Sequence, residues 1–174
     1  MPGLIRRLCV VVILGFYAEL ACCESLPPVG MGRASGPLPA ILVYHRFAQS
    51  ATDSMTVRTS SFAAQLEWLS ANGYVVIPLR LLVERIAGGS SRLPDKAVVI
   101  TADDGHRSVH SQMLPLVRRY RIPVTLFIYP SAISRADYAL DWGELEELKQ
   151  AGFDIQSHSY WHPNFSKEKR RLSP

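Results

Sequence analysis

The sequence lacks the features of a disulfide-rich, disordered or nucleic-acid-binding protein. It has three cysteines in 174 residues, too few for a small domain held together by disulfides. Its formal net charge is only +4, and residues 24–166 hold 13 basic and 13 acidic side chains, so the excess lies at the two ends. Neither DNA nor RNA is therefore an expected partner. Because 48% of the residues are hydrophobic, a packed globular core is expected instead of disorder.

Long hydrophobic runs are also missing. The apolar run over residues 8–17 is too short to span a bilayer, which takes about 20 apolar residues. Two arginines precede this run and small residues follow it, which is the layout of a secretory signal peptide over residues 1–23. Cys22, after Leu20 and Ala21, leaves a lipoprotein signal as the alternative. We expect export to the periplasm, cell envelope or medium, with membrane contact only through the signal or a lipid anchor.

Residues 24–39 follow as a linker that is rich in proline and glycine. A domain is expected over residues 40–174. No structural disulfide is expected, because Cys22 and Cys23 are adjacent and a bridge between them would be strained.

Short apolar runs alternate with stretches of helical period in the expected domain, which predicts βα units and a parallel sheet. The predicted strands are residues 41–44, 74–77, 97–101, 124–129 and 153–156. Four helices are predicted. The first is capped by Ser61 and ends before Gly73, and the second covers residues 79–87. The third starts near Gly105 with a kink at Pro115, and the fourth covers residues 142–150. The fold class is therefore α/β, either an open doubly wound sheet or a closed (β/α) barrel.

Residues that suit a metal ion follow three of these strands. His45 follows the first, Asp103 and Asp104 follow the third, and His158 and His162 follow the fifth. Both α/β architectures place their chemistry outside the carboxyl ends of the strands, whereas amphipathicity alone would scatter histidine and aspartate over helix faces. This concentration at strand ends indicates a functional site.

The adjacent carboxylates have two interpretations. In a partly buried cleft they repel each other, and one stable arrangement gives one carboxylate to a cation and leaves the other free to accept a proton. Alternatively, Asp103 or Asp104 caps the next helix and Gly105 eases the turn.

The two histidines after the fifth strand are four residues apart, so a single helical turn would place both imidazoles on the same side. Pro163 disfavours a longer helix there. His106 and His110 have the same spacing, but they lie on the predicted third helix and are interpreted as non-ligands.

Taken together, the two segments resemble motifs of the polysaccharide deacetylases, which are the NodB-homology or family 4 carbohydrate esterases. The first family motif is Thr-Phe-Asp-Asp-Gly and the second is His-Ser/Thr-x-x-His. The corresponding segments here are Thr101-Ala102-Asp103-Asp104-Gly105 and His158-Ser159-Tyr160-Trp161-His162. Tyr44-His45 is similar to the branch that includes poly-N-acetylglucosamine deacetylases. Ala102 departs from the family's phenylalanine, which removes packing but no reacting group.

The resemblance covers about residues 40–166 and implies a distorted (β/α) barrel with a metal-dependent site. Asp104, His158 and His162 would be the metal ligands and Asp103 the general base. The implied cofactor is a divalent ion, with zinc as the first candidate and cobalt, nickel or iron as alternatives. The ion would activate a water to hydrolyse N-acetyl groups of an acetylated amino sugar polysaccharide of the poly-N-acetylglucosamine, chitin or peptidoglycan type.

The remaining roles are open at this stage. His45 could protonate the leaving amine or bind substrate, or it could be a structural histidine bonded to backbone. Tyr160 and Trp161 could stack on sugar rings, or they could pack as ordinary apolar side chains. The alternatives to an N-deacetylase are a carbohydrate-binding fragment without turnover and an esterase for O-acetyl groups of xylan-type polymers.

Chain length predicts an incomplete barrel. A (β/α) barrel takes about 250 residues, whereas roughly 135 follow the linker and provide five strands. We therefore expect the C-terminal part of the domain to be missing.

Overall fold

The structure is a computed structural model that describes residues 38–51, 53–165 and 167. The predicted signal peptide, most of the predicted linker, and Cys22 and Cys23 lie outside the described residues. Within the described part, none of the helices has the length and apolar character required to cross a membrane.

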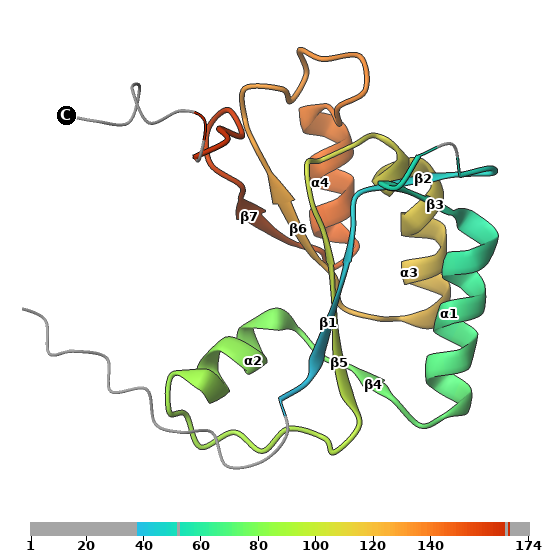
Figure 1. Cartoon of the computed structure of the whole chain (residues 1–174), viewed down its shortest axis with the longest axis vertical. Coiled ribbons are helices and arrows are strands. Elements are labelled where there is room, and N and C mark those ends of the chain that lie inside the picture. Colours follow the sequence, from blue (N-terminus) through green and yellow to red (C-terminus); the bar gives the residue numbers. More distant parts are fainter. Residues whose placement is uncertain (1–37, 52, 166, 168–174) are drawn as a thin grey trace, which may run out of the picture.

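A parallel sheet forms the centre of the structure (Figure 1). Four strands lie side by side in the order β1 (Ala40–Tyr44), β5 (Ala97–Ala102), β6 (Thr125–Ile128) and β7 (Asp154–Ser157). A short fifth strand, β4 (Val75–Val76), pairs with the start of β5. All these pairings are parallel. The five strands correspond to the five predicted apolar runs.

β5 is the central strand, and all six of its residues are buried. Such a strand reads as a continuous apolar run because helices cover both of its faces. Its residues alternate between two clusters, as the twofold period of a strand requires. Val98 and Ile100 belong to the main core cluster, while Ala97 and Val99 belong to a second, smaller cluster.

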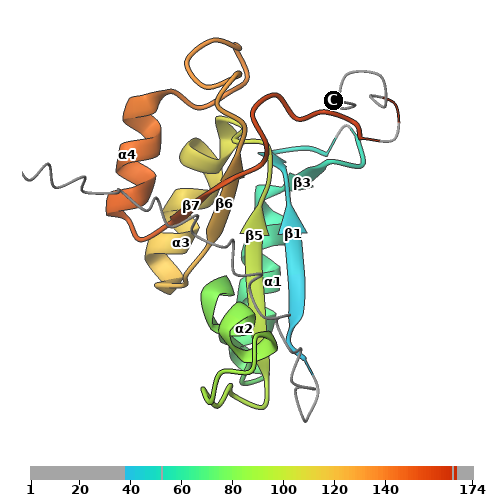
Figure 2. The ribbon, with the colours of Figure 1, turned by 90° about the vertical axis from the view of Figure 1, so that its left-hand side faces the viewer.

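The two clusters show which helices cover which face (Figure 2). The main cluster includes apolar side chains from α1 (Thr59–Ala71), α3 (Leu114–Tyr120) and α4 (Trp142–Gln150). The second cluster includes Leu82 from α2 (Leu79–Ile86). Three helices therefore pack on one face of the sheet, and α2 packs on the other.

Three predicted helix features are wrong, and they concern Ser61, Gly105 and Pro115. Ser61 is not the cap of the first helix, because α1 begins at Thr59 after Arg58, whose side chain makes no capping hydrogen bond. The third helix does not run continuously from Gly105. A π-helical turn, η1 (Val109–Met113), comes first, and α3 follows it.

Pro115 lies in the first turn of α3 instead of kinking a longer helix. A proline is tolerated there because the first turn needs no intrahelical bond from its N–H.

One paired element was not predicted. β2 (Arg46–Ala48) and β3 (Thr56–Arg58) form a separate two-stranded parallel sheet between β1 and α1.

The packing of α4 in the main core cluster gives a first test of the fold. Leu148 is completely buried in the main cluster, so Leu148→Ala is expected to lower the free energy of unfolding by about 2–5 kcal/mol. The exposed Val83 on α2 is the control, and Val83→Ala is expected to change it by less than about 1 kcal/mol. Urea unfolding followed by circular dichroism measures both values. Equal effects of the two substitutions would contradict this packing.

Candidate metal site

The candidate site lies where parallel strands end at the same edge of the sheet. Two backbone hydrogen bonds extend the strand pairing past the strand ends and fix the loops there. The N–H of Asp103 donates to the carbonyl of Tyr44 at 2.8 Å, and the N–H of His158 donates to the carbonyl of Ile128 at 2.7 Å. The loops after β5 and β7 are thereby held beside the ends of β1 and β6.

The structure brings together Asp104, His158 and His162. Oδ1 of Asp104 lies 3.7 Å from Nε2 of His158 and 3.5 Å from Nε2 of His162. The potential ligand atoms of the three residues all lie within 4.8 Å of one another. Two ligands bound tetrahedrally to one zinc ion are separated by about 3.3–3.6 Å, given metal–ligand bonds of about 2.0–2.2 Å. The spacing therefore suits a divalent ion bound by one oxygen and two nitrogens.

The environment of Asp104 also fits a cation. Its Oδ1 is buried and has no hydrogen-bond partner among the described residues. A buried carboxylate oxygen without a partner is costly, whereas a bound cation would satisfy it. Oxygen and imidazole nitrogen together suit zinc, cobalt, nickel or iron, so the donor set does not select one metal.

The backbone at the site adopts unusual conformations. Asp104, Ser159 and His162 have φ angles of 72°, 67° and 54°, in the left-handed region that non-glycine residues seldom occupy. Such conformations tend to cluster at functional sites. The single helical turn predicted for residues 158–162 is wrong, because the segment is a bend in which the N–H of His162 donates to Oγ of Ser159 at 3.0 Å. The bend nevertheless places the two imidazole centroids 4.7 Å apart.

Asp103 is a second carboxylate beside this cluster. Burial raises the pKa of its carboxyl group above the usual value, and the nearby His158 and His45 act in the opposite direction. A raised pKa makes an ionised carboxylate a better proton acceptor, as a general base requires. His45 is half-buried, directly after β1.

Tyr160 and Trp161 lie on the surface in the same bend as the two histidines. They are 59% and 50% exposed, and their rings meet edge to face at 6.1 Å. Neither ring therefore packs into the core. Two exposed aromatic rings beside the site leave their faces available to a sugar.

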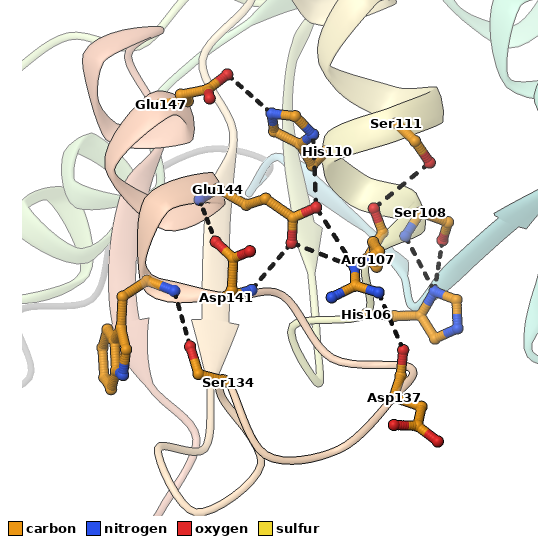
Figure 3. Close-up of polar contacts among 11 residues, drawn as sticks. His106, Arg107, Ser108, His110, Ser111, Ser134, Asp137, Asp141, Glu144 and Glu147 are labelled. Atoms are coloured by element: carbon orange, nitrogen blue, oxygen red, sulfur yellow. Dashed lines mark hydrogen bonds and ion pairs between the residues drawn. The ribbon is translucent and has the colours of Figure 1, made fainter.

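Neither His106 nor His110 belongs to the metal cluster. Nδ1 of His106 lies 2.8 Å from Oγ of Ser108, and Nε2 of His110 lies 3.0 Å from a carboxylate oxygen of Glu147 on α4 (Figure 3). His110 thus links η1 to α4.

Further contacts hold the loop after β5 against α4. Arg107 pairs with Glu144 at 3.4 Å, and Glu144 also forms a capping box with Asp141 at the start of α4 (Figure 3). The N–H of Leu140 donates to the carbonyl of Gly105 at 2.9 Å. These contacts fix the segment that contains the two aspartates.

One aromatic residue at the site was missed in the sequence. Tyr129 directly follows β6, and its ring stacks on the ring of His162 with centroids 5.3 Å apart. Its position at a strand end was the available signal, but tyrosine is not among the usual ligands of a divalent metal ion.

Part of this chain is similar to known deacetylases. Residues 90–172 match the model of the polysaccharide deacetylase family. The chain is related to the polysaccharide deacetylases. It is 37% identical over 82 residues to the poly-beta-1,6-N-acetyl-D-glucosamine N-deacetylase of Escherichia coli (strain K12), covering 46% of this chain and 12% of that protein. It is 24% identical over 110 residues to the enzyme of the same name from Staphylococcus epidermidis, covering 60% of this chain and 37% of that protein.

Solved deacetylase structures share the fold. The deacetylase PplD of Streptococcus pyogenes has a TM-score of 0.65 at 22% identity, over 73% of this chain and 58% of that one. IcaB from Ammonifex degensii has a TM-score of 0.62 at 23% identity, over 71% and 54%. These likenesses confirm the predicted α/β fold of the NodB-homology type. The present chain covers less than two thirds of the length of each of these four proteins.

Gly105 offers a test of how tightly the site is built. Its φ is +65°, and an added Cβ would lie 3.1 Å from Cγ2 of Ile128 and 3.3 Å from Cδ1 of Ile133. Gly105→Ala is therefore expected to lower the free energy of unfolding by about 2–4 kcal/mol, from backbone strain and overpacking together.

Gly152→Ala is the matched control, because Gly152 has a φ of +95° but no atom within 4 Å of the added Cβ. It is expected to lose only the strain component of about 1–2 kcal/mol. Chemical denaturation measures both, and a loss at Gly105 no larger than at Gly152 would show that the site tolerates the extra atom.

Proposed function

We propose that this chain is a metal-dependent N-deacetylase that hydrolyses N-acetyl groups of an exported amino sugar polysaccharide, with poly-β-1,6-N-acetylglucosamine as the first candidate. The observation that supports it most directly is the buried, unpartnered Oδ1 of Asp104 facing the Nε2 atoms of His158 and His162. The names of the relatives support the choice of substrate. The signal peptide proposed for residues 1–23 supports export.

Asp104, His158 and His162 would hold the ion through Oδ1 and two Nε2 atoms. A divalent ion at this position supplies Lewis acidity, which lowers the pKa of a water and polarises a carbonyl group. Zinc is the proposed metal, with cobalt, nickel and iron as alternatives.

Asp103 would act on the proton of the attacking water. The water oxygen adds to the carbonyl carbon of the acetamide while the Asp103 carboxylate takes the proton. The C–N bond then breaks, the sugar nitrogen receives a proton, and acetate leaves. His45 is the proposed proton donor, because it directly follows β1, and β1 pairs with β5, which is directly followed by Asp103.

The exposed rings of Tyr160 and Trp161 support a second candidate function, which is carbohydrate binding without turnover. The two functions share the same surface and differ in whether acetate is released.

Acetate release tests the proposed activity. The full chain, loaded with Zn²⁺ or Co²⁺ and mixed with acetylated glucosamine oligomers, is expected to release acetate. Asp103→Asn is expected to lower that rate at least 100-fold, because the proton acceptor is lost, while Co²⁺ binding stays within about threefold.

Asp104→Ala is expected to abolish Co²⁺ binding, and the control His110→Gln, outside the cluster, is expected to retain it. Oligomer binding without acetate release from the metal-loaded chain would exclude the deacetylase and favour the second function.

The aromatic rings have a separate prediction. Tyr160→Ala and Trp161→Ala are each expected to raise KM for acetylated oligomers about 5–150-fold, since stacking of a substrate ring on an aromatic side chain contributes about 1–3 kcal/mol. Their kcat is expected to change little, because neither ring meets the reacting atoms. Trp68→Ala is the control, since Trp68 is exposed on α1. Unchanged KM in both variants would remove the rings from substrate binding.

A further inference from the structure

Tyr129 contacts one of the candidate ligands directly. Its ring is stacked on the imidazole of His162 with an interplanar angle of 27° and a centroid distance of 5.3 Å. The side chain of His162 is 52% exposed, so little surrounding structure restrains its ring. A contact from another side chain is needed to keep Nε2 directed at Asp104. The stacked tyrosine provides such a contact.

Tyr129 is in turn fixed by Tyr138. Their hydroxyl oxygens are 2.7 Å apart, so one hydroxyl donates to the other. This hydrogen bond restrains the hydroxyl end of Tyr129, while the stacking contact restrains its ring.

Tyr138 is anchored to the loop that contains the candidate carboxylates. Its ring is stacked on His106 at 6.2 Å with an interplanar angle of 14°. Its carbonyl accepts a hydrogen bond from the N–H of Arg107 at 2.8 Å. The two tyrosines thus connect the loop after β5, which contains Asp104, with the bend after β7, which contains His162.

We propose that Tyr129 and Tyr138 are positioning residues for the metal site, in which Tyr129 holds the plane of the His162 ring and Tyr138 fixes Tyr129 to the loop after β5. The pair would set the affinity and geometry of ion binding. This inference rests on the proposed function only in requiring that the three ligands bind a divalent ion.

Co²⁺ titration of the full chain tests the inference without an activity assay. The absorption spectrum of bound Co²⁺ reports its coordination geometry, and the titration gives its Kd. Tyr129→Leu removes the stacked ring and is expected to raise the Kd for Co²⁺ about 10–100-fold and to alter the spectrum.

Tyr129→Phe and Tyr138→Phe keep both rings and remove one hydrogen bond. Each is expected to raise the Kd about 3–10-fold. The double variant is expected to be no weaker than either single one, because both changes remove the same bond.

Tyr120→Phe is the matched control, since Tyr120 at the end of α3 donates a hydrogen bond to Glu67 on α1, outside the candidate site. It is expected to leave both the Kd and the spectrum unchanged. Urea unfolding of the metal-free variants shows whether each retains the fold.

The inference is overturned if Tyr129→Leu folds and binds Co²⁺ with a Kd within about twofold of that of the unaltered chain and with the same spectrum. If Tyr129→Leu does not fold, the same result for both phenylalanine variants overturns the inference. It is also overturned if the unaltered chain binds no Co²⁺. If the chain binds Co²⁺ and the variants behave as expected but acetate is never released, the proposed deacetylase activity fails and the positioning role stands.

Discussion

The arrangement of the site depends on one buried carboxylate oxygen. Oδ1 of Asp104 is withdrawn from solvent without a hydrogen-bond partner in the described structure, and two imidazole nitrogens face it at 3.5 and 3.7 Å. Several neighbouring conformations are also unfavourable by themselves, because left-handed φ angles at non-glycine residues cost about 1–3 kcal/mol each. A cation bound there would offset these terms, so ion binding and the stability of this edge of the fold are coupled.

The rest of the fold explains how such a site can be maintained. β5 is buried along its whole length and ends directly at the two aspartates. The close approach of Ile128 and Ile133 to Gly105 then leaves the turn little freedom. The two adjacent carboxylates have different surroundings. Asp104 faces two imidazoles, whereas Asp103 has a raised pKa chiefly because it is buried. One strand end thereby supplies a candidate ligand and a candidate base.

The strands and the gathering of histidine and aspartate at strand ends were predictable from local rules, whereas the choice of Asp104, His158 and His162 as candidate ligands came from the family resemblance. Apolar runs form buried strands, and the ends of parallel strands meet at one edge of a sheet, so the residues after the third and fifth predicted strands were expected to lie together. The helix cap, the π-helical turn and the bend at residues 158–162 depend on tertiary context. The local conformational preferences of the residues did not reveal that α1 would begin at Thr59, directly after Arg58. Nor did they reveal that His162 would adopt a left-handed conformation.

The stacking of Tyr129 on His162 shows a different limit. A tyrosine after an apolar strand is ordinary in a sequence, and its role depends on which ring it meets after folding. Here the ring of Tyr129 stacks on His162, which follows β7, and its hydroxyl forms a hydrogen bond with the hydroxyl of Tyr138 in the loop after β6. The candidate ligands come from two loops that no short sequence motif connects, so their relative geometry must be fixed by residues outside both motifs. The two tyrosines satisfy that requirement, because together they contact a residue of each loop.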